Sequence, residues 1–167
     1  MKKISKIVMA FFLCFSLWAC SNQELFKEEE ITMEAIQEKI ENDESFVMIV
    51  ERENCGFCES IQEYIEETKQ EHPGIVLYKL DTTNFGFYTN PEPAKTLSAN
   101  TDQGKAFLQL APYFYYTPTI YRFEKGRIVE VAVGFSDATK EVSVGGLDEP
   151  IDFDQAQTQD FWEFISK

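Results

Sequence analysis

The chain has 167 residues, enough for one globular domain, since domains average roughly 150 residues. Hydrophobic residues make up 44% of it, with 15 Phe and 7 Tyr, so it can build a substantial core and is not a disordered chain. The 15 Lys and Arg stand against 29 Asp and Glu, and the formal charge of −14 repels phosphate backbones. Nucleic acid is therefore excluded as a partner.

The first 19 residues have the layout of an export signal. Three lysines precede the apolar run 7–19, whose 13 residues fall short of the ~20 that a transmembrane helix needs. Cleavage at its end removes these lysines and no acidic residue, which takes the formal charge to −17. The sequence therefore predicts an extracytoplasmic protein, with 1–19 as a signal peptide, 20–30 as an acidic tether and 31–167 as the domain.

Cys20 directly follows the apolar run. The segment Leu17-Trp18-Ala19-Cys20 resembles the lipobox of bacterial lipoproteins, in which the cysteine receives a diacylglycerol and signal peptidase cuts before it. The resemblance implies lipidation at Cys20 and attachment to the cell membrane through that lipid anchor. Trp18 departs from the pattern, because that family usually has a small residue there, so ordinary secretion and an uncleaved anchor stay open as alternatives.

The exported part retains only Cys55 and Cys58 besides Cys20, since Cys14 lies in the leader. A Cys-x-x-Cys spacing occurs in zinc sites, structural disulfides and redox pairs. Zinc needs four ligands, and the chain offers a single histidine and no second pair, so we expect no metal and no cofactor. A structural disulfide stays open, although so small a loop contributes little stability, and the spacing favours thiol–disulfide exchange.

Hydrophobic periodicity predicts a helix over 32–42 and a buried strand over 45–50. A second helix begins at Cys55, with apolar residues at helical spacing and glutamates on the other face, and ends before His72. A second buried strand over 75–81 completes a β-α-β unit, which is right-handed by default.

The polar and aromatic stretch 82–100 contains two prolines and predicts a surface loop of unusual length. The remaining segments predict, in chain order, a helix from Thr101, a hairpin of strands 120–123 and 128–133, a loop over 136–151 and a helix that a capping box opens at Asp154. His72, next to Pro73, is interpreted as a solvated residue at the end of a helix.

This order of elements, over roughly Thr32 to Ser166, resembles the thioredoxin family. The motifs that carry the resemblance are Cys55-Gly56-Phe57-Cys58 after an apolar strand, Thr117-Pro118-Thr119 before the hairpin, and Gly134 closing the last strand. The resemblance implies an α/β, thioredoxin-like fold with a central mixed sheet flanked by helices. It also implies that Pro118 is cis and lies against the cysteine pair; a turn at an edge strand is the alternative.

Two departures from that family affect the chemistry. Phe57 replaces the usual proline between the cysteines, and the family's buried acid, six residues before the first cysteine, aligns with Ile49. Glu51 or Glu53 could substitute for that acid, but we expect both to be solvated surface carboxylates.

A helix N-terminus favours an anion, so we expect Cys55 to be the nucleophile, and Cys58, one turn further in and less exposed, to be the resolving cysteine. Contacts to the substrate are expected from Gly56, which allows another backbone to approach, and from the apolar ring of Phe57. If Pro118 is cis, the backbone of Thr117 would pair with a substrate strand. A partly buried helix residue is the alternative for Phe57.

These features predict a membrane-anchored, extracytoplasmic thiol–disulfide oxidoreductase that forms, reduces or isomerises disulfides in exported proteins or peptides. A reductase would need a membrane redox partner to supply electrons. The alternative is a non-catalytic binding module on a thioredoxin scaffold with a structural disulfide. The leader, the acidic domain and the long inserts also resemble the bacteriocin transport accessory proteins of Gram-positive bacteria.

Overall fold

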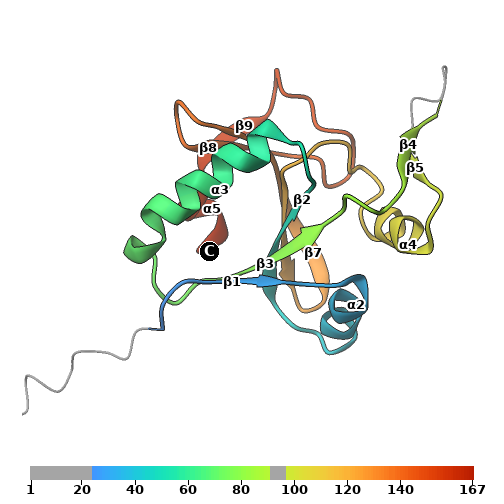
Figure 1. The fold of residues 1–167 in the computed structure, drawn as a ribbon, viewed down its shortest axis with the longest axis horizontal. Coiled ribbons are helices and arrows are strands. Elements are labelled where there is room, and N and C mark those ends of the chain that lie inside the picture. Colours follow the sequence, from blue (N-terminus) through green and yellow to red (C-terminus); the bar gives the residue numbers. More distant parts are fainter. Residues whose placement is uncertain (1–23, 91–96) are drawn as a thin grey trace, which may run out of the picture.

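The computed structural model describes residues 24–90 and 97–167, which form a mixed sheet with helices on both faces (Figure 1). The strands are β1 (Lys27–Glu30), β2 (Phe46–Glu51), β3 (Val76–Asp81), β4 (Phe87–Thr89), β5 (Leu97–Ala99), β6 (Thr119–Glu124), β7 (Arg127–Ser136), β8 (Glu141–Val144) and β9 (Gln157–Asp160). Seven of them form one sheet in the order β1-β3-β2-β6-β7-β8-β9, and β4 pairs with β5 separately. Strands β1, β3 and β2 are parallel, and the other pairs are antiparallel.

Helices α3 (Gly56–Thr68) and α5 (Phe161–Ile165) cover one face of the sheet, and α2 (Met33–Glu41) and α4 (Asp102–Leu110) lie on the other side (Figure 1). A short 3₁₀ helix, Lys69–Glu71, follows α3. The order α2-β2-α3-β3-α4-β6-β7-α5 is the one that the resemblance implied, so the α/β class and the thioredoxin-like fold are confirmed. No helix in the described part of the chain is long and apolar enough to cross a membrane.

Strand β2 is the centre of the core, because it is buried on both faces. Met48 and Val50 belong to the cluster beneath α2 and α4, whereas Ile49 belongs to the cluster beneath α3, and none of the three is accessible to solvent. Successive side chains of a strand point to opposite faces, so a strand covered on both sides is apolar throughout. Burial on both faces therefore explains the continuous apolar run that predicted this strand.

The last residues of the predicted acidic tether, 20–30, form a strand of the sheet. Residues 27–30 form β1, which pairs in parallel with β3, and the amide of Gly74 donates to the carbonyl of Glu24 at 2.6 Å. This part of the segment 20–30 therefore belongs to the domain, and Phe26 already contacts Trp162, with the ring centroids 5.4 Å apart.

The predicted loop over 82–100 contains structure of its own. Strands β4 and β5 form a small sheet beside α4, and Phe87 packs on Phe107 and Phe114 of the main core. Buried aromatic contacts hold this insertion on the domain, so it is not a loose surface loop. Residues 91–96 lie outside the described residues.

The C-terminal predictions are also corrected. The predicted loop over 136–151 contains β8, and the predicted helix from Asp154 begins only at Phe161, with Asp160 as its cap. Residues 157–160, just before this helix, form β9, whose backbone pairs with β8. Its side chains are mostly exposed and polar, so hydrogen bonding to the sheet rather than apolar periodicity makes it a strand.

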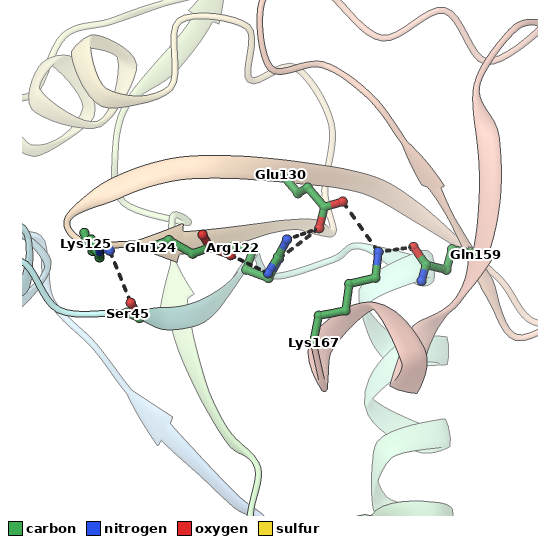
Figure 2. Close-up of polar contacts among 7 residues, drawn as sticks. All are labelled: Ser45, Arg122, Glu124, Lys125, Glu130, Gln159 and Lys167. Atoms are coloured by element: carbon green, nitrogen blue, oxygen red, sulfur yellow. Dashed lines mark hydrogen bonds and ion pairs between the residues drawn. The ribbon is translucent and has the colours of Figure 1, made fainter.

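Hydrogen bonds and ion pairs of charged side chains hold the C-terminal residue at the end of the sheet where β2 begins (Figure 2). Arg122 donates from Nε to Glu130 and from Nη1 to Glu124, each at 2.8 Å. Lys167 donates to Gln159 at 2.8 Å and reaches Glu130 at 3.5 Å. The last residue is thus tied to β7 and β9.

Candidate active site

Cys55 and Cys58 form a disulfide at the N-terminus of α3, where β2 has just ended. Their Cα atoms lie 5.2 Å apart. Cys55 caps the helix, because its backbone is extended and its Sγ accepts a hydrogen bond from the Cys58 amide at 3.3 Å. The predicted position of Cys55 at a helix N-terminus is confirmed, and the positive end of the helix faces its sulfur.

Thr117 brings further polar groups to the same sulfur. Its Oγ1 donates to Cys55 Sγ at 3.3 Å, and its carbonyl oxygen lies 3.4 Å from that atom. The Thr117–Pro118 peptide bond is cis, as the resemblance implied. Pro118 precedes β6, which lies between β2 and β7, so the alternative of a turn at an edge strand is wrong.

Gly134, on the neighbouring strand β7, forms a backbone hydrogen bond to Pro118. Its amide donates to the Pro118 carbonyl at 2.8 Å, and its φ of 73° is one that glycine adopts without strain. It does not close the last strand, since β7 continues to Ser136 and further strands follow.

The two cysteines are almost covered, whereas the residues between them are open. Cys55 is 7% exposed and Cys58 4%, but Phe57 is 64% exposed. The interpretation of Phe57 as a partly buried helix residue is therefore wrong, and its ring is available to a bound molecule. A Cβ at Gly56 would meet nothing within 4 Å, and its φ is not positive. No tight turn requires glycine there, although the open space leaves room for another backbone.

Two grooves meet at a ridge formed by Phe57, Tyr116 and Thr117. The first, about 480 Å³, lies between the cysteine loop, the sheet of β4 and β5, and the segment before the cis proline; we call it the aromatic groove, and its lining includes Arg52, Cys55, Tyr88, Leu97, Tyr116 and Thr117. The second, about 390 Å³, lies against β7 and β8, and Phe135 and Phe153 line it; we call it the apolar groove. Cys55 lines the aromatic groove, so a molecule bound in this groove lies beside the disulfide.

Glu51, the last residue of β2, is a buried carboxylate and not the solvated one that we expected. Burial raises the pKa of Glu51 to about 7, against the opposing influence of a hydrogen bond from Gln62 of α3 at 3.0 Å and the charge of Lys79. Glu53 is exposed, as expected. Residues two apart on a strand share a face, so Glu51 follows Ile49 beneath α3. That alternation was the signal in the sequence for a buried acid.

Three further predictions concern the lipid anchor, metal binding and His72. Cys20 lies outside the described residues. Within 24–90 and 97–167, no three His, Cys, Asp or Glu side chains gather as metal ligands would. The ring of His72 stacks on Trp162 with centroids 4.0 Å apart, so it is a packed, half-buried residue and not a solvated one.

The arrangement is suited to thiol–disulfide exchange. In the reduced protein a Cys55 thiolate would receive hydrogen bonds from the Cys58 amide and the Thr117 hydroxyl, both already directed at its sulfur. Cys58, within disulfide distance, can displace whatever is bound to Cys55.

No family model matches this sequence, and no curated protein matches it. Among solved structures, it is similar to a chain of the complex of ferredoxin:thioredoxin reductase with thioredoxin f2, at 16% identity and a TM-score of 0.46, over 67% of this chain and 86% of that one. It is also similar to thioredoxin F from spinach chloroplast, at 15% identity and a TM-score of 0.45, over 68% and 87%. A thioredoxin of Malassezia sympodialis has 15% identity and a TM-score of 0.45, over 72% and 90%.

Proposed function

We propose that this chain is a membrane-anchored, extracytoplasmic thiol–disulfide oxidoreductase that acts on exported proteins or peptides. The observation that carries the proposal is the convergence on Cys55 Sγ of the Cys58 amide and the Thr117 hydroxyl, at the start of α3 and beside a cis proline. A disulfide with a purely structural role would need neither of these hydrogen-bond donors. The resemblance to the bacteriocin transport accessory proteins supports an exported peptide as one class of substrate.

The reaction follows from the two sulfurs. In the reducing direction, the Cys55 thiolate attacks a substrate disulfide, forms a mixed disulfide and expels one substrate sulfur as a thiolate. The Cys58 thiolate then attacks Cys55 Sγ, releases the second substrate thiolate and closes the Cys55–Cys58 disulfide. Two electrons pass to the substrate, and the two thiol protons of the pair end on its sulfurs. Oxidation of a substrate dithiol is the reverse.

The extracytoplasmic location is proposed from the leader and from Cys20, which resembles a lipidated cysteine. Outside the membrane no glutathione pool holds thiols reduced, so the pair would be oxidised unless a membrane partner supplies electrons. Mass spectrometry of the mature N-terminus tests the anchor. We expect a diacylglyceryl group on Cys20, and an unmodified or uncleaved N-terminus would overturn the lipid anchor.

The reduction potential of the Cys55–Cys58 pair tests the function. We would equilibrate the purified full-length protein, in mild detergent, with dithiol–disulfide buffers of known potential and count free thiols. A value of roughly −120 to −180 mV would identify a donor of disulfides, and one near −270 mV a reductant with a membrane electron source. A value far below about −300 mV would identify a structural disulfide and overturn the proposed function.

A further inference from the structure

The aromatic groove is built by an insertion that a minimal thioredoxin-like core does not need. Strands β4 and β5 stand between β3 and α4 and supply Tyr88 and Leu97 to the wall opposite Cys55. Tyr88 is 48% exposed although Phe87 beside it packs into the core, so the insertion is held firmly while this ring faces outward. A rigid wall with an open aromatic ring suits ligand binding.

The charge of the groove differs from that of the molecule. The chain carries 29 Asp and Glu, yet none of the described residues that line this groove is acidic. Arg52 lines it, is exposed, and has no ion-pair partner among the described residues. A positive group beside exposed aromatic rings is complementary to a ligand that combines an aromatic ring with a carboxylate.

The groove is continuous with the reacting sulfur. Cys55 lines the aromatic groove and does not line the apolar groove, which also contains Glu141. A peptide whose sulfur reached Cys55 would therefore place the side chain next to its cysteine against Tyr88 and Tyr116. The volume of about 480 Å³ admits a large side chain with part of its backbone.

We propose that the aromatic groove is a substrate subsite for an extended peptide segment that carries an aromatic side chain next to its reacting cysteine and an acidic residue within two positions. This assignment rests on the proposed function and names the substrate class of the same site. Tyr88 receives the aromatic ring, and Arg52 pairs with the carboxylate. Both residues determine specificity and take no part in the exchange of sulfur bonds.

The test uses single-cysteine peptides in mixed disulfide with 2-mercaptoethanol. The full-length protein is first reduced with a small dithiol, which is then removed. The Cys55 thiolate attacks the peptide sulfur and expels 2-mercaptoethanol as thiolate, after which Cys58 attacks Cys55 and releases the peptide thiol. The two electrons come from the cysteine pair, whose thiol protons pass to the two products. The measured quantity is the second-order rate constant for each peptide.

Four peptides vary the neighbour of the cysteine between Phe and Gly, and the residue beyond it between Glu and Gln. We expect the Phe peptides to react on the order of tenfold faster than the Gly peptides. Tyr88→Ala lowers that ratio towards one, whereas Tyr113→Ala, which removes another exposed tyrosine outside the groove, retains it. Arg52→Gln abolishes the preference for Glu over Gln and leaves the preference for Phe.

Equal rates for all four peptides, with bis(2-hydroxyethyl) disulfide still reduced, would overturn the subsite and leave the proposed function standing. Reduction of neither the peptides nor the small disulfide would overturn the proposed function and the subsite with it. Should Tyr88→Ala fail to fold, the Arg52→Gln variant decides, because its side chain is exposed and makes no ion pair with the described residues.

Discussion

Thr117 Oγ1 donates a hydrogen bond to Cys55 Sγ across 3.3 Å, although 62 residues separate the two in the chain. The contact exists because β6 lies beside β2, which brings the cis proline segment to the start of α3. A neutral hydroxyl therefore supports the same sulfur as the helix amide. Its effect is open to measurement without disturbing the cysteines.

Thr117→Val removes this hydroxyl and keeps the branched shape. A hydrogen bond to a charged group contributes roughly 1.5–3 kcal/mol, so the Cys55 thiolate is less stabilised in the variant. We expect iodoacetamide to alkylate Cys55 of the reduced protein about tenfold more slowly at pH 7, as followed by mass spectrometry. Thr117→Ser retains a hydroxyl and should react at the same rate as the protein without a substitution. Identical rates for the Val and Ser variants would contradict the role of the hydroxyl.

Cys58→Ser removes the resolving sulfur and leaves Cys55 free to attack. We expect mixed disulfides to accumulate between Cys55 and exported proteins, visible as slow-migrating bands on non-reducing gels that disappear on reduction. Cys55→Ser is the matched control and should form no such bands, because Cys58 is the more covered of the two cysteines. The absence of adducts in both variants would favour a binding module with a structural disulfide.

Glu51 makes stability depend on pH, with a definite sign. Its pKa is raised from an ordinary value of 4.5 to about 7 by burial, so between these values the folded protein keeps a proton that the unfolded chain has released. The free energy of unfolding therefore falls as the pH rises through this window. Above pH 7 the ionised, buried Glu51 lowers it by roughly 3 kcal/mol in total.

Glu51→Gln keeps an acceptor for Gln62 and removes the titrating group. We expect the variant to be more stable than the unmodified protein at pH 8, by about 2–3 kcal/mol, and of similar stability at pH 4. Urea denaturation over this pH range measures the difference, with Glu53→Gln as an exposed control. Parallel pH profiles for the Glu51→Gln variant and the unmodified protein would show that Glu51 is not the group responsible.

Gly104 and Gly56 form a contrasting pair of helical glycines. A Cβ at Gly104 would clash with the Phe85 carbonyl oxygen and lie 2.6 Å from Ala99 Cβ, so α4 would have to move away from β5. We expect Gly104→Ala to reduce the free energy of unfolding by about 1–3 kcal/mol. Gly56→Ala meets open space and should cost no stability, since alanine favours a helix. Equal effects in denaturant titrations would refute the close approach at Gly104.

The parts of the fold that could be predicted are those whose side chains carry the signal. The run from Phe46 to Val50 is apolar because both faces of β2 are covered, and the apolar positions of α3 recur every turn because one face is buried. The resemblance carried by Thr117-Pro118 implied a cis proline beside the cysteines; the cis bond and the Thr117–Cys55 hydrogen bond confirm it.

Two of the missed strands, β1 and β9, have mostly exposed side chains. The residues of β1 are one lysine and three glutamates, and those of β9 are all polar, so neither shows an apolar alternation. Backbone hydrogen bonds to β3 and β8 define them instead. Glu51 shares a strand face with Ile49, which marks it as a candidate buried acid, but the packing of α3 over the end of β2 decides that it is buried.

The hydrogen bond between Gly74 and Glu24 also determines how an anchored molecule would face its surroundings. A lipid on Cys20 would leave only three residues before Glu24, a reach of about 14 Å at full extension. The starts of β1, β3 and β2 would then stand next to the bilayer, with Cys55 about 20 Å further out, the length of β2. Such a geometry would turn the disulfide away from the bilayer, so partners would meet it from outside, and an electron donor in the membrane would need a domain tall enough to reach over the protein.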